Sequence, residues 1–219
     1  MSDYVIPFEK LRNKDVAAVG GKNASLGEMI SQLNAQGVRV PSGFATTANA
    51  FNDFLKNDKL GDRIISELKN LDVNDVIALA KSGKKIRKWI LNTPFTENFD
   101  KAIKESYEKL IKASAKGTTF AVRSSATAED LPDASFAGQQ ESFLNIHGIE
   151  NIKQAIKEVF ASLYNDRAIS YRVHQGFVHS EVAISAGIQQ MVRSDIGCSG
   201  VMLLLTLNQD LKMLSLSQL

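Results

Sequence analysis

Two short apolar segments on either side of a loop of small residues constrain the fold of this chain most. Residues 120–122 read Phe-Ala-Val, and residues 142–146 read Ser-Phe-Leu-Asn-Ile. Apolar and aromatic residues in runs of this length are typical of strands, and the small residues between the runs permit a connection. We therefore predict a β-hairpin in which Arg123 lies at the end of the first strand.

The loop after Arg123 has a composition that suits a polyphosphate. It is rich in small, hydroxylated and acidic residues, including Ser124, Ser125 and Thr127, and Gly138-Gln139 lies at its far end. A guanidinium supplies forked, permanently charged donors, and small residues let backbone N–H groups come close to an anion. The alternative is a surface hairpin whose arginine is merely solvated.

A second segment also favours anion binding. Gly20-Gly21-Lys22 precedes a helical pattern in which Leu26, Met29, Ile30 and Leu33 share one face. Asn23 or Ser25 is the expected N-cap, so Lys22 should lie just outside a helix N-terminus, where the backbone favours anions. The segment is not a Walker A loop, and an ordinary surface lysine after a turn remains the alternative.

The remaining pattern predicts an α+β fold with mixed helices and an antiparallel sheet. A short strand is expected near residues 4–8, and residues 181–192 alternate apolar and polar side chains as a strand does. Ser199–Met202 would pair with that strand across the turn at residues 194–197. Helices are expected at residues 26–36, 48–55, 63–71, 73–80, 97–114 and 149–163, with the last continuing into 168–175.

Composition excludes several classes of protein. The formal net charge is +2 with basic and acidic residues interspersed, which does not favour nucleic acid, and the basic cluster at residues 81–88 is expected to be a solvated face. The single Cys198 permits no internal disulfide, and the three histidines show no metal-ligand spacing. The N-terminus does not read as a signal peptide and no apolar run could span a membrane, so we expect a cytoplasmic protein.

Several of these segments together resemble one family. From residue 4 to residue 202, in family order, the chain is similar to the N-terminal nucleotide-binding domain of the phosphoenolpyruvate synthase (pyruvate, water dikinase) family, whose relatives include pyruvate phosphate dikinase and rifampicin phosphotransferase. The matching segments are GGKNASLGEM (20–29), VPSGFATT (40–47), VRSSATAEDLPDASFAGQ (122–139), DRAISYR (166–172), QQMVRSD (189–195) and SGVM (199–202).

The resemblance implies an incomplete ATP-grasp-like domain that binds ATP. Adenine would lie against a connecting strand, which the family pattern places at Gln189, Gln190, Met191 and Val192. An ordinary core strand explains Met191 and Val192 equally well. The phosphates would contact Lys22, Arg123, Ser124, Ser125 and Thr127 together with the Gly138-Gln139 backbone.

The implied reaction of the full-length family is ATP + pyruvate + water → AMP + phosphoenolpyruvate + phosphate, through a phosphohistidine. No histidine here matches the phosphoacceptor motif, so we expect no catalytic residue and an inactive chain. Mg²⁺ ligands and the pyruvate site are also expected outside it, which leaves ATP as its partner, without nucleic acid or membrane. The alternatives are part of a rifampicin phosphotransferase-like enzyme, or a non-catalytic remnant.

Residues 203–219 depart from the family pattern. They read LLLTLNQDLKMLSLSQL, and one possible coding sequence for a family-like peptide, FTLDTESGFEDAVFVTA, yields this string after loss of a single T. We therefore assign residues 1–202 to the ATP-binding domain and expect residues 203–219 to be a frameshifted tail. Sequencing the gene tests this: the hypothesis fails if no reading frame downstream encodes family-like sequence.

Overall fold

The computed structural model describes residues 4–127, 130–131, 134–135, 141–193, 196 and 200. Outside this description lie the predicted hairpin partner Ser199–Met202 except Gly200, the loop residues Gly138 and Gln139, and the tail at 203–219. The strands are β1 (Val5–Pro7), β2 (Gly43–Thr46), β3 (Phe120–Ala126), β4 (Asp130–Leu131), β5 (Ala134–Ser135), β6 (Ser142–Ile146) and β7 (Ile184–Gln190). The helices are α1 (Val16–Leu33), α2 (Ala48–Lys56), α3 (Leu60–Leu68), α4 (Val76–Asn92), α5 (Glu97–Lys112), α6 (Ile149–Ser162) and α7 (Asp166–His174), with short 3-10 turns at 8–10, 13–15, 34–36 and 57–59.

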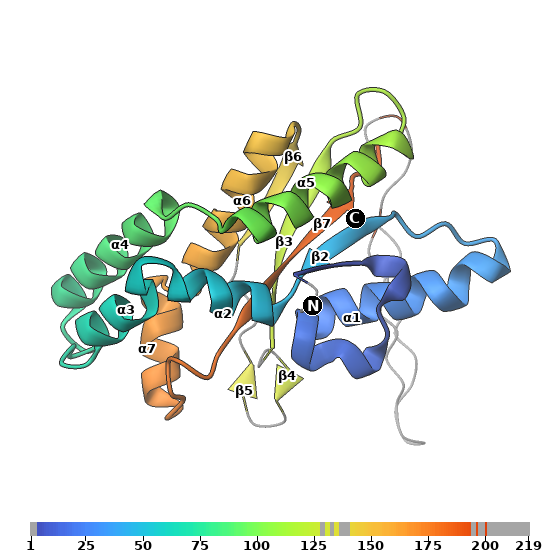
Figure 1. Cartoon of the computed structure of the whole chain (residues 1–219). Helices are drawn as coiled ribbons and strands as arrows, with labels where there is room; N and C mark the ends of the chain where they lie inside the picture. Colours follow the sequence, from blue (N-terminus) through green and yellow to red (C-terminus); the bar gives the residue numbers. More distant parts are fainter. Residues whose placement is uncertain are drawn as a thin grey trace, which may run out of the picture.

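Five strands form one antiparallel sheet in the order β1-β2-β7-β3-β6, and β4 pairs with β5 (Figure 1). The α+β class with an antiparallel sheet is therefore confirmed. The two apolar segments at 120–122 and 142–146 also pair as predicted, in β3 and β6. β7 lies at the centre, between β2 and β3, although it comes last among these strands in the sequence. The sheet therefore joins the two ends of the described chain.

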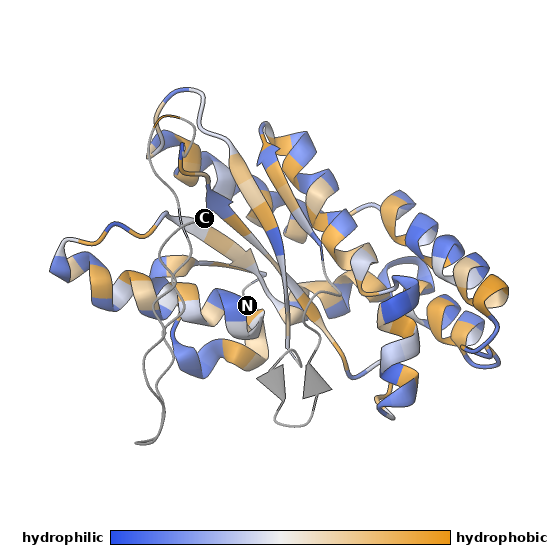
Figure 2. Cartoon of the chain, turned by 180° about the vertical axis from the view of Figure 1, so that it is seen from behind, coloured by the Kyte–Doolittle hydropathy of each residue, from blue (hydrophilic) through white to orange (hydrophobic). Residues whose placement is uncertain are grey.

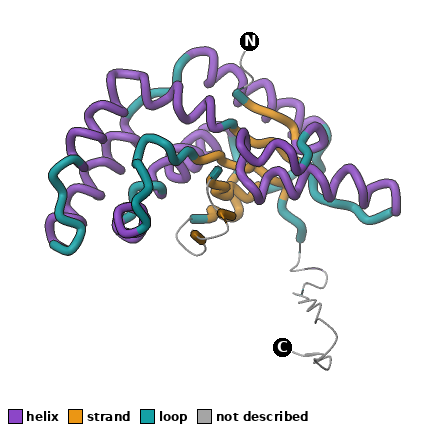
Figure 3. The backbone as a smooth tube through the Cα atoms, turned by 90° about the horizontal axis from the view of Figure 1, so that it is seen from below, coloured by secondary structure: helices purple, strands orange, loops and turns teal. Residues whose placement is uncertain are grey.

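The two faces of the sheet belong to different cores. Phe44, Val122 and Ile188 pack with helices α2–α6 in the larger core, where Phe160 stacks on Phe99 with ring centroids 6.3 Å apart. Ala45, the neighbour of Phe44 along β2, belongs instead to a smaller core with α1. Adjacent strand residues point to opposite faces, so the strands lie between helices on both sides (Figure 3).

Local sequence explains where several helices begin. The Thr47 hydroxyl accepts a hydrogen bond from Ala50 N at 3.1 Å, and Asp75 Oδ1 accepts from Ile77 N and Ala78 N at 3.0 Å each. These side chains satisfy backbone N–H groups that have no partner inside α2 and α4. Hydrophobic and hydrophilic residues then alternate around the helices, as Figure 2 shows, which lets each bury one face.

Three predicted boundaries were wrong. The strand after residue 120 does not end before Arg123 but continues to Ala126 because β7 pairs with it along its whole length. The helix expected at 73–80 runs from Val76 to Asn92 and includes the basic cluster, because Asp75 caps it.

The expected continuation of the helix at 149–163 into 168–175 is interrupted between α6 and α7. Arginines bind the carbonyl groups at this break: Arg172 Nη1 donates to Leu163 O at 2.6 Å, and Arg87 Nη1 donates to Tyr164 O at 2.7 Å. Carbonyls at a helix C-terminus need such partners.

Helix α1 contains a kink at Gly20. This residue has φ 75° and ψ 162°, so the helix is interrupted there and resumes at Gly21. A Cβ at Gly20 would lie 2.6 Å from the carbonyl oxygen of Ser125 and 2.7 Å from its carbonyl carbon. Glycine is therefore required at this position for two reasons, its backbone conformation and the close approach of β3.

We predict that Gly20→Ala lowers the free energy of unfolding by roughly 2–5 kcal/mol, the sum of backbone strain and steric overlap. Gly117→Ala is the matched control, because Gly117 also has a positive φ of 83° but no atom within 4 Å of the added Cβ. The control should lose only about 1–2 kcal/mol from strain. Urea denaturation measures both, and equal losses would show that the contact with β3 is unimportant.

Arg172 is fully buried in the last turn of α7, and its Nε donates to His179 Nδ1 at 3.0 Å. Burial, assisted by the charge of Arg172, lowers the pKa of His179 to about 4. In the unfolded chain a histidine titrates near pH 6.5, so between these values the unfolded state binds a proton that the folded state does not. Stability from neutral His179 is therefore present above pH ~6.5 and is lost as the pH falls toward 4.

We predict that His179→Gln weakens the loss of stability between pH 7.5 and pH 5, because glutamine can accept the same hydrogen bond without titrating. The difference in slope should not exceed ~1.4 kcal/mol per pH unit, the limit for one proton. His174→Gln, which changes an exposed imidazole at the C-terminal end of α7, is the control and should retain the wild-type slope. Urea titrations across this pH range would contradict the prediction if all three proteins gave one slope.

Candidate nucleotide-binding site

Lys22 lies in the first turn of the segment of α1 that resumes after Gly20. It is exposed, and the backbone N–H groups of this turn point out of the helix N-terminus, where the helix dipole favours anions. The position is close to the predicted one, although the predicted N-cap is wrong. Asn23 lies inside the helix and is 2% exposed, and Ser25 also lies inside it.

Asn23 connects the kinked helix to the sheet. Its Nδ2 donates to Val19 O at 3.0 Å and to Ser185 Oγ at 2.9 Å, and its backbone N donates to Ser125 Oγ at 3.4 Å. The Ser185 hydroxyl in turn donates to Thr46 O at 2.5 Å. The side chains of this network are buried and fully used within the protein, so the network fixes α1 against β2, β3 and β7.

The register of β3 and β7 places Arg123 on the same face as this network. Arg123 pairs with Gly187, and Ser125, two residues further along the strand, pairs with Ser185. Asn23 contacts both Ser125 and Ser185, so this face is the one that α1 covers. Gly187, opposite Arg123, has no side chain to obstruct it. The structure thus brings Lys22 and Arg123 to one side of the sheet.

The Arg123 side chain is half-buried. Within the part of the chain that the structure describes, it makes no hydrogen bond and no ion pair. A guanidinium that is neither fully solvated nor paired is suited to binding an anion from solution.

The other predicted phosphate contacts are arranged differently. Ser124 is 3% exposed and points to the opposite face, where its neighbours along β3, Val122 and Ala126, are buried. The Thr127 hydroxyl donates to Ala183 O at 3.2 Å, and the Ser125 hydroxyl accepts from Asn23. The Ser125 and Thr127 hydroxyls therefore also hold the fold together, and the phosphate contacts of all three residues stay predictions.

The predicted adenine-binding segment lies at the end of β7. Gln189 Nε2 donates to Pro41 O at 3.2 Å, and Gln190 Nε2 donates to Ser114 Oγ at 2.5 Å. The backbone N–H groups of Gln190 and Met191 are also taken, by Ser42 O and Thr119 O at 2.9 Å each. Sequence reasoning expected the strand end to offer these N–H groups to adenine, but the structure uses them to fasten β7 to its neighbours.

Met191 and Val192 remain accessible at this strand end. The Met191 sulfur accepts a hydrogen bond from Asn145 N at 3.0 Å, and Val192 is 68% exposed. Asn145 has φ 58°, so β6 bends where it meets the methionine. An apolar surface of this kind suits the face of a purine ring.

Among the residues that the structure describes, no group of three or more His, Cys, Asp or Glu side chains could hold a metal ion. None of the helices described is long and apolar enough to cross a membrane.

Comparison with known proteins gives this arrangement a context. Residues 16–212 match the family model for the pyruvate phosphate dikinase AMP/ATP-binding domain, and this range includes part of the tail that we expect to be frameshifted. The chain is 64% identical over 201 residues to a phosphoenolpyruvate synthase of Neisseria meningitidis, covering 91% of this chain and 25% of that protein. It is also similar to the phosphoenolpyruvate synthases of Pseudomonas aeruginosa (59% identical; 92% of this chain, 25% of that protein) and Escherichia coli (58% identical; 92% and 25%).

The chain thus spans about a quarter of the length of these relatives. The family model covers far more than half of the chain, and its match includes Lys22, Arg123 and the end of β7. The fold is the ATP-grasp-like fold of that family, and its members are phosphotransferases. This chain belongs to the pyruvate phosphate dikinase AMP/ATP-binding domain family.

Proposed function

We propose that this chain is the ATP-binding part of a phosphoenolpyruvate synthase. The observation that carries the proposal is the placement of Lys22 and Arg123 on one face of the sheet, held there by Asn23. The similarity to phosphoenolpyruvate synthases over nine-tenths of the chain favours this branch of the family over a rifampicin phosphotransferase-like enzyme.

In this proposal the two cations act on the phosphates. Lys22 supplies a compact charge at a helix N-terminus, and Arg123 supplies a forked donor from the sheet. Phosphoryl transfer spreads negative charge over the phosphate oxygens, and fixed positive groups stabilise that charge without reorganising. Met191 and Val192 would contact the base. This chain's own contribution is therefore to bind and orient the nucleotide.

The complete reaction would require further protein. ATP, pyruvate and water would give AMP, phosphoenolpyruvate and phosphate, with a histidine on another domain as the phosphate carrier. Mg²⁺ is bound by oxygen ligands, so carboxylates outside the described residues would have to bind it. We infer that the chain alone binds ATP weakly, gains little affinity from Mg²⁺ and does not turn over. A coupled assay for AMP and phosphate separates this from an active enzyme.

We predict that Arg123→Ala weakens ATP binding by about tenfold or more, because a charge-assisted hydrogen bond is worth ~1.5–3 kcal/mol. Lys22→Ala should weaken binding in the same direction. Lys116→Ala, which removes an exposed lysine from the turn before β3, is the control and should bind as the wild type does. Isothermal titration calorimetry measures all four proteins. Wild-type affinity in both site variants would mean that these cations do not contact the nucleotide.

A further inference from the structure

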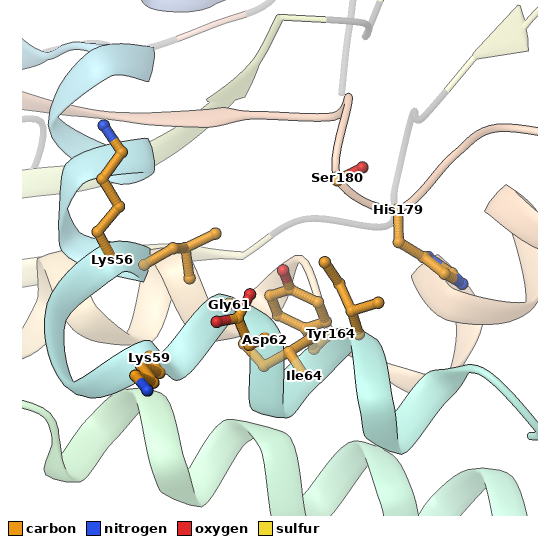
Figure 4. Close-up of a pocket in the computed structure, with 10 residues that line it drawn as sticks. Lys56, Lys59, Gly61, Asp62, Ile64, Tyr164, His179 and Ser180 are labelled. Atoms are coloured by element: carbon orange, nitrogen blue, oxygen red, sulfur yellow. The ribbon is translucent and has the colours of Figure 1, made fainter.

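A second concave site lies away from the residues assigned to ATP. It is a cavity of about 280 Å³ between α2, α3 and the segments that precede α7 and β7 (Figure 4). None of the described residues that are predicted to contact ATP lines it, so it is distinct from the candidate nucleotide site. Its lining residues are Leu55, Lys56, Lys59, Gly61, Asp62, Ile64, Ile65, Tyr164, His179 and Ser180.

The walls combine apolar side chains, Leu55, Ile64 and Ile65, with two hydroxyl groups, those of Tyr164 and Ser180. Tyr164 is only 3% exposed, and its hydroxyl makes no hydrogen bond to any part of the chain that the structure describes. Burial raises the pKa of this hydroxyl to about 12, so it carries its proton at neutral pH. In Figure 4 the Tyr164 ring lies among the lining side chains. Arg172 Nη2 is the one fully buried side-chain nitrogen or oxygen atom without a partner among the described residues, so the Tyr164 hydroxyl opens into the cavity, where it can donate to an acceptor.

A buried positive charge lies directly behind this wall. The Arg172 guanidinium is fully buried, with Cζ 5.5 Å from the centre of the Tyr164 ring and Nε hydrogen-bonded to His179. Its Nη2 has no hydrogen-bond partner, and none of the described carboxylates pairs with it. Burial lowers the pKa of Arg172 to about 10, which still leaves it charged at neutral pH.

An unpaired buried charge is costly, and its field is weakly screened in the protein interior. An anion in the adjacent cavity would compensate it. The rim adds Lys56 and Lys59 against a single acid, Asp62, although Lys56 already pairs with Asp53 at 2.7 Å. The electrostatics of the site therefore favour a negatively charged occupant.

We propose that this cavity binds a small carboxylate with an apolar body. The carboxylate accepts the Tyr164 hydroxyl hydrogen bond in the field of Arg172, and the apolar body packs on Leu55, Ile64 and Ile65. A phosphate ester is a poorer fit, because a dianion needs several charge-assisted donors close to it, whereas the wall offers two neutral hydroxyls, Tyr164 and Ser180, and the lysines lie at the rim. A purely apolar ligand would leave the hydroxyl unpaired. The site is independent of the proposed ATP function.

Benzoate is the probe, titrated into the complete chain by calorimetry, and benzyl alcohol is its uncharged counterpart. We expect benzoate to bind at least about fivefold more tightly than benzyl alcohol. Tyr164→Phe removes only the hydroxyl and should weaken benzoate binding about tenfold. Tyr107→Phe, on α5 against Phe120, is the matched control and should change nothing.

A second variant keeps the test decisive if Tyr164→Phe unfolds. The nearest atom to a Cβ added at Gly61 would be 3.4 Å away, which is an ordinary contact. Gly61→Leu is therefore compatible with α3, and its side chain is expected to fill the cavity. It should abolish benzoate binding while circular dichroism remains native. No benzoate binding to the wild type, equal binding of the two probes, or undiminished binding in Gly61→Leu would each overturn the proposal.

Discussion

The hydrogen bonds of Asn23 are the constraint on which the candidate site depends. This one buried residue joins α1 to strands that follow it by more than a hundred residues: its backbone N donates to Ser125 Oγ on β3, and its side-chain Nδ2 donates to Ser185 Oγ on β7. The contact is possible only because glycines stand at the points of closest approach: a Cβ at Gly187 would overlap the Asn23 side chain, and one at Gly20 would overlap Ser125. Removing this contact would separate Lys22 from the sheet that carries Arg123.

Alternate residues along a strand of this sheet point to opposite faces, one toward the core and the other toward the candidate site. Along β3, Val122 and Ser124 point to the large helical core, whereas Arg123 and Ser125 point toward α1. A slip of one residue in the pairing of β3 with β7 would exchange the two sets and bury the guanidinium in the core. The placement of Arg123 and the packing of the core are therefore specified by a single register, and the central position of β7 enforces it from both sides.

The sequence predicted the elements better than the roles of individual residues. Strands at 120–122, 142–146 and 181–192 and most helices were evident from periodicity, because apolar spacing directly reflects burial. The hydrogen bonds that Ser125, Thr127 and the two glutamines make within the fold were not, since a hydroxyl or amide that binds phosphate and one that fastens two strands look identical in a sequence. Asn23 was expected to cap a helix because small polar residues near a glycine usually do so; its true partners lie on distant strands.

Arg123 and Arg172 are buried to different extents, and the extent of burial determines which kind of anion each is suited to bind. Neither Arg123 nor Arg172 forms an ion pair with any residue that the structure describes. Arg123 is half-buried beside a glycine, so solvent hydrates its charge until a highly charged group replaces the water. Arg172 is fully buried and acts only through Tyr164 and His179, which exclude a hydrated dianion but not a singly charged group with an apolar body. In the two proposals the same side chain thus favours a phosphate at one depth and a carboxylate at another, because the free energy of desolvating the ligand must be matched by the donors that the protein can present.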